Sequence, residues 1–183
     1  MIKVKRFLSV ILCMIFVLSL TACGDKTGGG SDHSVDIEYY AKLGQISDIE
    51  YKLGDSVEDT KTILSETLDD HGEPMYFDYQ SGDYTVMTDG SVCCCYKTAD
   101  EAAGITHIVK YGDAYGFTVG AVSTQVRDTM SDMGYDTEER EAKSGELFFL
   151  PASAGITVLE YQIKDNTVLF VFQEHALSTT VIY

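Results

Sequence analysis

Three consecutive cysteines, Cys93-Cys94-Cys95, are the residues of this 183-residue chain whose type and spacing most directly suggest chemistry. Thiols in such a cluster can pack as small apolar groups, take part in redox or intermolecular pairing, or bind a metal. Cys93 and Cys95 would lie roughly 6.5–7 Å apart on an extended chain, at or beyond the limit for a disulfide. Zinc sites need about four ligands at spacings such as Cys-x-x-Cys, which the chain lacks. We therefore expect the cysteines to pack as small apolar groups, with redox or intermolecular pairing as the first alternative and metal binding as the second.

The other residues that could act in catalysis or bind a metal form no motif. No serine lies in a Gly-x-Ser-x-Gly turn, and nothing selects a pair of carboxylates for glycoside hydrolysis. The acidic clusters at 69–70 and 138–141 lack the calcium-loop pattern, so a solvated surface is favoured. The histidines are scattered, without metal-ligand spacing: His33, His71, His107 and His175. We expect no enzymatic activity, no cofactor and no metal site.

The N-terminal 23 residues carry the most specific pattern in the sequence. A basic stretch at 3–6 precedes an apolar stretch at 7–20 that is too short for a stable membrane span. The segment ends in Leu20-Thr21-Ala22-Cys23, which resembles a bacterial lipobox. The resemblance implies that residues 1–22 are a lipoprotein signal peptide and that Cys23 is lipidated. An ordinary secretory signal peptide is the alternative.

These features predict a protein on the extracytoplasmic face of the cell membrane, held there by lipid. Acyl chains bury methylene groups at ~0.8 kcal/mol each, so a diacylglycerol-modified Cys23 would be a firm anchor. Residues 23–45, which are Gly-rich and polar at their start, are expected to form a tether. The net charge of −16 excludes nucleic acid as a partner and permits a basic protein partner.

The region from 120 to 173 predicts one helix followed by antiparallel strands. Ser123 can cap a helix at 123–133, and Gly134 fits the position after its last turn. Residues rich in β-branched and aromatic side chains predict strands at 136–142, 146–150, 156–163 and 167–173. A two-residue turn at Asp165-Asn166 would pair Lys164 with Thr167.

That pairing sorts the side chains of the last two strands onto two faces. One face is apolar and is expected to pack on a helix, with Leu159, Tyr161, Ile163, Val168, Phe170 and Phe172. The opposite face is mixed in character and is expected to be open, with Val158, Glu160, Gln162, Leu169, Val171 and Gln173.

A fainter copy of this unit occupies residues 54–111. Ser56 or Asp55 can cap a helix that extends to about Leu68, and strands are predicted at 75–80, 83–88, 91–97 and 105–111. A turn at Asp89-Gly90 would set Cys93 opposite Val86 and Cys95 opposite Tyr84. Cys94 would then point into the core, as the match of Tyr96 with Tyr161 also suggests. Gly54 with Gly120 and Leu64 with Met130 further mark the repeat.

Three shorter segments flank the repeats. Residues 37–44 predict a short helix with Tyr39, Tyr40 and Leu43 on its apolar side. Residues 46–53 predict a strand, and residues 178–183 predict a final edge strand. The chain is therefore expected to be an α+β protein of two tandem repeats, each a short helix packed on a four-stranded antiparallel meander, at 46–113 and 114–183.

This doubled unit resembles the architecture of the β-lactamase inhibitory protein, and the helix starts at 54–64 and 120–130 resemble those of BamE-type assembly lipoproteins. The resemblance implies a non-catalytic module that binds a protein, as an inhibitor or in envelope assembly. The alternative is an envelope lipoprotein that binds a small ligand in a pocket between the halves. The resemblance places the partner on the outer sheet face, at Tyr84, Cys93, Cys95, Val158, Glu160, Leu169 and Val171.

Overall fold

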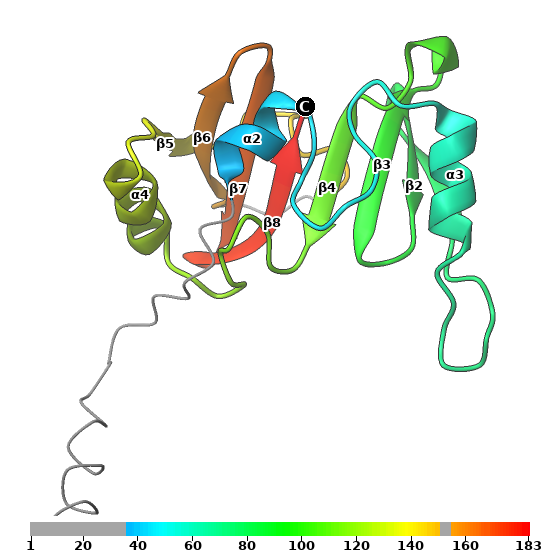
Figure 1. Ribbon diagram of the computed structural model, residues 1–183, viewed down its shortest axis with the longest axis horizontal. Coiled ribbons are helices and arrows are strands. Elements are labelled where there is room, and N and C mark those ends of the chain that lie inside the picture. The colour runs from blue at the N-terminus through cyan, green and yellow to red at the C-terminus, as the bar shows by residue number, and fades with distance from the viewer. Residues whose placement is uncertain (1–35, 151–154) are drawn as a thin grey trace, which may run out of the picture. The chain divides into compact units, whose positions relative to one another are not determined.

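The computed structural model describes residues 36–150 and 155–183. The predicted signal peptide, Cys23 and the first part of the predicted tether lie outside these residues. Within them the fold is α+β, with three α-helices and one eight-stranded antiparallel sheet (Figure 1). The helices are α2 (Ile37–Lys42), α3 (Val57–Ser65) and α4 (Ser123–Asp132), with a 3-10 turn η1 at Glu101–Ala103. The strands are β1 (Phe77–Ser81), β2 (Tyr84–Thr88), β3 (Val92–Lys97), β4 (His107–Tyr111), β5 (Glu138–Glu141), β6 (Thr157–Ile163), β7 (Asn166–Gln173) and β8 (Ala176–Ile182).

The strands form a single sheet in the order β1-β2-β3-β4-β8-β7-β6-β5. Each half is a helix followed by four strands, as predicted, but the second half uses different segments. Residues 146–150 are turns and not a strand, and β8 supplies the missing strand. The prediction that 178–183 form an edge strand is wrong, because β8 pairs with β4 on one side and β7 on the other.

The two halves are related by matching backbone contacts. Gly54 N donates to Ile105 O at 2.8 Å, and Gly120 N donates to Leu177 O at 2.9 Å. Both glycines have positive φ, which a residue with a side chain rarely adopts. Counting from these contacts along β4 and β8 makes Val109 equivalent to Val181, and these two residues pair with each other. The halves therefore meet at a pseudo-two-fold axis between β4 and β8.

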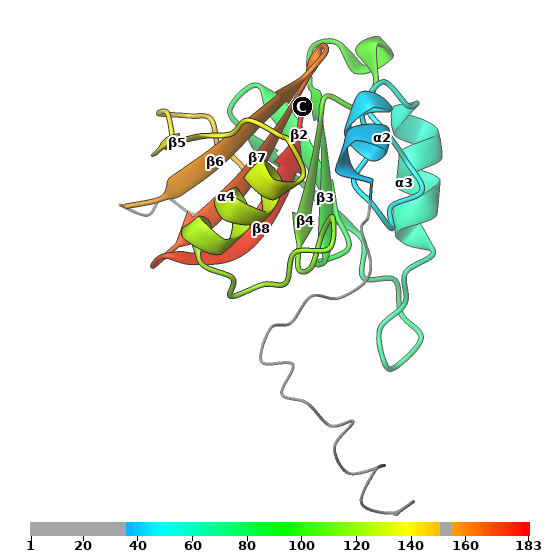
Figure 2. The same cartoon turned by 60° about the vertical axis from the view of Figure 1, so that its left-hand side comes forward.

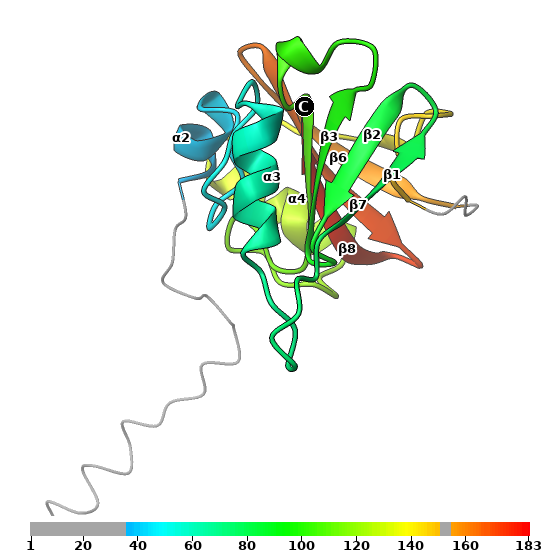
Figure 3. The same ribbon diagram turned by 90° about the vertical axis from the view of Figure 1, so that its right-hand side faces the viewer.

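One face of the sheet, here called the inner face, is covered by the helices. Figures 2 and 3 show α2 and α3 on this side. The helices α3 and α4 bury equivalent residues, Leu64 and Met130, in one continuous apolar cluster with β-strand residues such as Phe170. The cluster extends across both halves, so neither half has a core of its own.

Local chemistry explains most helix boundaries. The Ser56 side chain accepts a hydrogen bond from Asp59 N and caps α3 as predicted, but the helix ends at Ser65 and Leu68 is exposed. The cap of α4 is Val122 rather than Ser123. Ser123 Oγ instead donates to the Glu139 carboxylate at 3.2 Å, which links α4 to β5.

The segment before α3 differs from its prediction. The helix α2 forms, but its buried residues are Ile37 and Ala41, whereas Tyr39 is exposed. Residues 46–53 form turns and not a strand, although Ile46 and Tyr51 are buried under the helices. The folded body thus includes residues that the sequence assigned to the tether.

Both central hairpins are displaced by two residues from the predicted register. Ile163 pairs with Asn166 instead of Val168, and Cys93 pairs with Thr88 instead of Val86. A shift of two residues keeps every side chain on its face, whereas a shift of one would reverse them all. The predicted division into an inner and an outer face is consequently confirmed for both hairpins.

Candidate functional site

The predicted partner-binding residues gather on the outer face of the sheet, but that face is not open. Five of them are buried: Cys93, Cys95, Val158, Leu169 and Val171. Tyr84 and Glu160 are half-buried. Residues 142–150, which follow β5, lie over them, on the side opposite α2 and α3 (Figures 2 and 3). We call residues 142–150 the crossing segment, and a partner can reach the five buried side chains only if this segment leaves.

Aromatic packing seats the crossing segment on the sheet. The Phe148 ring stacks on Tyr84 with ring centroids 4.2 Å apart, and Phe149 is buried against the outer-face cluster. The Ser81 hydroxyl donates to Phe148 O at 2.7 Å, and the Tyr111 hydroxyl donates to Phe149 O at 3.5 Å. These contacts span from the end of β1 to β4, so the segment crosses most of the first half.

An ion cluster holds the other end of the crossing segment. Arg140 on β5 donates to Glu146 of the segment (Nη1–Oε2, 2.9 Å) and to Glu160 on β6 (Nε–Oε2, 2.8 Å). The Arg140 hydrogen bonds lower the pKa of Glu146, and burial opposes this only in part. Burial raises the pKa of Glu160, but hydrogen bonds from Gln162 and Arg140 outweigh it and the net shift is downward. The charged forms are therefore favoured, and Glu160 serves this cluster in place of the predicted partner contact.

His107 lies in the aromatic packing under the crossing segment. Its ring is edge-on to Tyr84 and to Phe148, with centroids 5.2 Å from each, and stacks on Tyr183. Burial, together with the nearby Lys97 charge, lowers the pKa of His107 to about 4. The ring is consequently neutral at physiological pH and acts as a packing residue.

The cysteines occupy positions that carry large apolar residues in the second half. Cys93 pairs with Val109 as Leu169 pairs with Val181, so Cys93, Cys94 and Cys95 correspond to Leu169, Phe170 and Val171. All three thiols are free and buried, with Cys94 on the inner face as predicted. Burial raises the pKa of each thiol, so the reactive thiolate is disfavoured. These observations support the prediction that the cysteines pack as small apolar groups.

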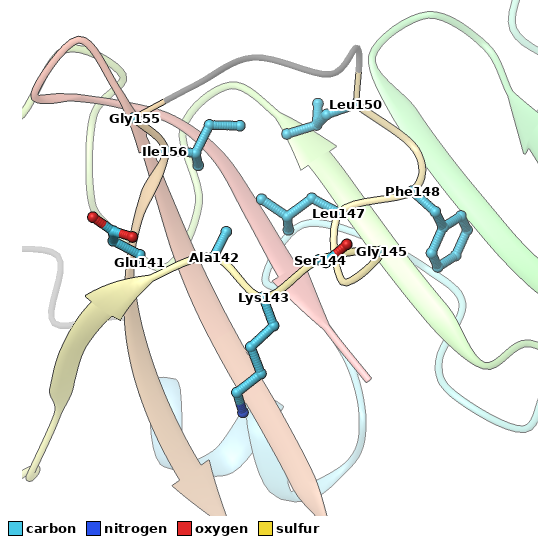
Figure 4. Close-up of a pocket in the computed structure, with 10 residues that line it drawn as sticks. All are labelled: Glu141, Ala142, Lys143, Ser144, Gly145, Leu147, Phe148, Leu150, Gly155 and Ile156. Atoms are coloured by element: carbon cyan, nitrogen blue, oxygen red, sulfur yellow. The ribbon is translucent and has the colours of Figure 1, made fainter.

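A pocket of about 450 Å³ lies between the crossing segment and the start of β6. Figure 4 shows Leu147, Leu150 and Ile156 pointing into it from different parts of its wall. Lys143 points away from it, and Phe148 turns toward the strands of the first half. These apolar side chains share the lining with polar residues such as Glu141 and Ser144, so the pocket is mixed in character.

Exposed apolar side chains of the sheet lie elsewhere, at and just before the edge strand β1. Met75, Phe77 and Tyr79 alternate along the chain and are 43%, 53% and 38% exposed. The rings of Phe77 and Tyr79 stack with centroids 6.2 Å apart on the outer-face side, next to the part that the crossing segment covers. We call these three residues the β1 ridge.

Sequence reasoning missed the β1 ridge. The strand itself was predicted, and its apolar–polar alternation is visible in Phe77-Asp78-Tyr79-Gln80. That alternation at the outermost strand of a meander would have indicated an exposed apolar row. The prediction instead followed central strands, whose side chains the structure buries.

The connection from α3 to β1 adds acidic groups beside the ridge. Residues 67–75 form a small arm in which Asp69 N donates to Glu73 O at 2.8 Å and Met75 N donates to Thr67 O at 3.0 Å. The arm projects beyond the end of α3 (Figure 3). From 66 to 83 the chain has no Lys or Arg and carries Glu66, Asp69, Asp70, Glu73, Asp78 and Asp83.

Comparison with protein-family models, with curated proteins and with solved structures gives no match for this chain. Across residues 36–150 and 155–183, no helix is long and apolar enough to cross a membrane. Within the same residues, no group of three or more His, Cys, Asp or Glu side chains is placed to hold a metal ion. The resemblance to β-lactamase inhibitory and BamE-type proteins stays a prediction.

Proposed function

We propose that the protein is a lipoprotein anchored through Cys23 to the extracytoplasmic face of the cell membrane, where it binds another protein without catalysing a reaction. The observation that carries this proposal is the β1 ridge. Large apolar side chains aligned on a strand edge are costly to leave in water and typically mark an interaction site. We therefore assign the partner-binding surface to the β1 margin of the outer face and not to the covered centre of that face.

Site-specific photo-crosslinking of the full chain in the cells that produce it tests this function. A photoreactive phenylalanine analogue replaces Tyr79 in one variant and Val119 in a control. Val119 is 45% exposed and lies outside the β1 ridge, so it presents a comparable apolar side chain to solvent. We expect a discrete protein adduct from position 79 and none from position 119.

Two outcomes contradict the proposal. Equal adducts from both positions would indicate nonspecific contact with apolar surface. No protein adduct from position 79, with the variant present at the membrane in normal amount, would remove the protein-binding function.

The pocket between the crossing segment and the start of β6 supports a second candidate, the binding of a small ligand. Its volume of about 450 Å³ is within the range of small-molecule sites. The pocket lies in the second half and not between the halves, where a ligand site was expected. Native mass spectrometry of the protein purified from its own cells tests this candidate, which predicts a bound species that Leu147→Arg displaces.

A further inference from the structure

We propose that the free edge of β1 binds an extended, Lys- or Arg-containing segment of the partner as an added β-strand. This inference rests on the proposed protein-binding function and specifies the partner. It follows from the backbone of β1, from the side chains on its two sides and from the charge around it.

The backbone of β1 presents unpaired groups in register. Asp83 O accepts a hydrogen bond from Thr98 N, so Asp83 and its alternate neighbours along β2 point toward β3. The residues between them, including Tyr84 and Val86, point toward β1 and pair with Ser81 and Tyr79. The amide and carbonyl groups of Asp78 and Gln80 therefore point away from the sheet, and none of the strands in residues 36–150 and 155–183 pairs with them there.

The two sides of β1 differ in the side chains that they offer an added strand. Phe77 and Tyr79 lie on the outer-face side and would contact apolar residues of the added strand. Asp78 lies on the helix side, where its carboxylate accepts a hydrogen bond from the Tyr76 hydroxyl at 3.0 Å. Side chains alternate along a strand, so the favoured partner alternates apolar residues with basic ones.

The charge of this region favours a basic partner over a second copy of the chain. Residues 66–83 carry carboxylates and no Lys or Arg, and Lys61 of α3 is placed over the Tyr76 ring at 5.6 Å. Pairing β1 with β1 of a second molecule would bring two such acidic regions together, within chains that each carry a net charge of −16. Like charges brought together oppose association, whereas Lys or Arg on the partner would relieve the repulsion already present.

The opposite edge of the sheet lacks these properties. β5 has the sequence Glu138-Glu139-Arg140-Glu141, and charged residues of this kind discourage the addition of a strand. Its Arg140 is already engaged with Glu146 and Glu160. The protein thus offers one edge that accepts a strand and one that is protected.

The test uses the full chain in detergent and a blocked, fluorescent peptide of alternating lysine and valine. A second peptide replaces every lysine with glutamate. A third replaces every L-valine with D-valine, which keeps the composition and charge but prevents regular strand geometry. Anisotropy measures affinity, and hydrogen exchange read by mass spectrometry measures the protection of the amides in 74–83.

We expect the lysine–valine peptide to bind at least about tenfold more tightly than either control peptide. It should slow exchange in 74–83 and leave β5 unchanged. The double variant Phe77→Ser/Tyr79→Ser should weaken binding at least about fivefold, because it removes the apolar contacts. The matched double variant Val119→Ser/Met133→Ser, at exposed apolar positions outside β1, should bind normally.

Several results overturn this inference. Equal binding of the D-valine peptide would show that charge alone is recognised. Slowed exchange at β5, or no binding up to about 1 mM, would exclude an added strand at β1. Dimers in light scattering that Phe77→Ser/Tyr79→Ser dissociates would identify a second copy as the occupant. If these tests fail while position 79 still crosslinks to one protein, the protein-binding function stands and only strand addition is lost.

Discussion

The two edge strands occupy equivalent places in the two halves and have opposite chemistry. Tyr79 on β1 pairs with Val86, and Arg140 on β5 pairs with Val158, at corresponding positions of the outer face. By the same correspondence, Phe77 stands where the second half has Glu138. One edge therefore exposes aromatic rings where the other places charged groups.

The two edges also differ in their contacts with the crossing segment. In the second half the edge residue Arg140 joins β5, β6 and the crossing segment, and thereby helps to cover the outer face. In the first half no segment of the described chain covers the aromatic residues of the edge, and they stay exposed. The proposed binding at β1 and the closure of the outer face from β5 should therefore be separable by mutation.

The largest effect is expected from the residues that the halves share. Leu64→Ala and Met130→Ala each remove a buried side chain from equivalent helices, and each should cost about 3–4 kcal/mol of unfolding free energy. Because the inner cluster is continuous, both variants should unfold in one transition in urea. A variant in which one half melts while the other stays folded would contradict a shared core.

A smaller effect is expected at the edges, where the halves differ. Arg140→Leu leaves Glu146 and Glu160 without their cation and should cost about 2–3 kcal/mol, since all three side chains are partly exposed. Tyr79→Leu should cost less than about 1 kcal/mol because the ring is exposed. Exchange in 142–150 should rise in the first variant alone.

The Arg140 cluster also predicts an acid dependence. The pKa of Glu146 is lowered in the folded state, so its stabilisation is present above the pKa of the unfolded chain and is lost as the pH falls through the folded pKa. Arg140→Leu should flatten the stability curve in this acidic range. If the unfolding free energy of this variant depended on acidic pH as that of the unchanged protein does, the cluster would not stabilise the fold.

The lowered pKa of His107 predicts a loss of stability on acidification that begins at a higher pH than the loss caused by the carboxylates. Its pKa is about 4 in the folded state and about 6.5 when unfolded, so the unfolded chain takes up the proton first as the pH falls. Stability should fall by roughly 1–2 kcal/mol between pH 7 and 5. The equivalent residue of the second half is Thr179, which does not titrate, and His107→Thr should remove this dependence. A slope that persists in that variant would assign it to another group.

The smallest effect is expected at the cysteines. Cys95→Val introduces the residue found at the equivalent position 171 and should change stability by less than about 1 kcal/mol. The three thiols should react with a maleimide only after unfolding. Rapid reaction of the folded protein would support the redox alternative instead.

Much of the fold could be predicted because side chains alternate between the two faces of a sheet, so an error of two residues in the pairing still assigns each side chain to the correct face. The predicted turns misplaced the pairing of Ile163 and of Cys93 by two residues, yet both residues stayed on the correct face. The glycines at 54 and 120 were recognised as equivalent, and in the structure both adopt positive φ and donate to equivalent carbonyl oxygens.

The errors arose where tertiary contacts decide between local alternatives. Residues 146–150 resemble a strand because the last four are apolar, but Phe148 and Phe149 pack onto an existing sheet instead of extending it. The same coverage buries Leu169 and Val171, which the sequence placed at an open binding face. No local pattern reveals that two distant strands, β4 and β8, pair at the centre.

That central pairing has a consequence for how the chain reaches its folded state. Val109 and Val181 face each other across the pseudo-two-fold axis although about 70 residues separate them, and closing such long loops slows folding. Until β8 is in place, β4 and β7 each present an unpaired apolar edge. A chain interrupted before Ala176 would keep both edges exposed, so the intermediate that lacks β8 is the species most prone to aggregate and to need a chaperone.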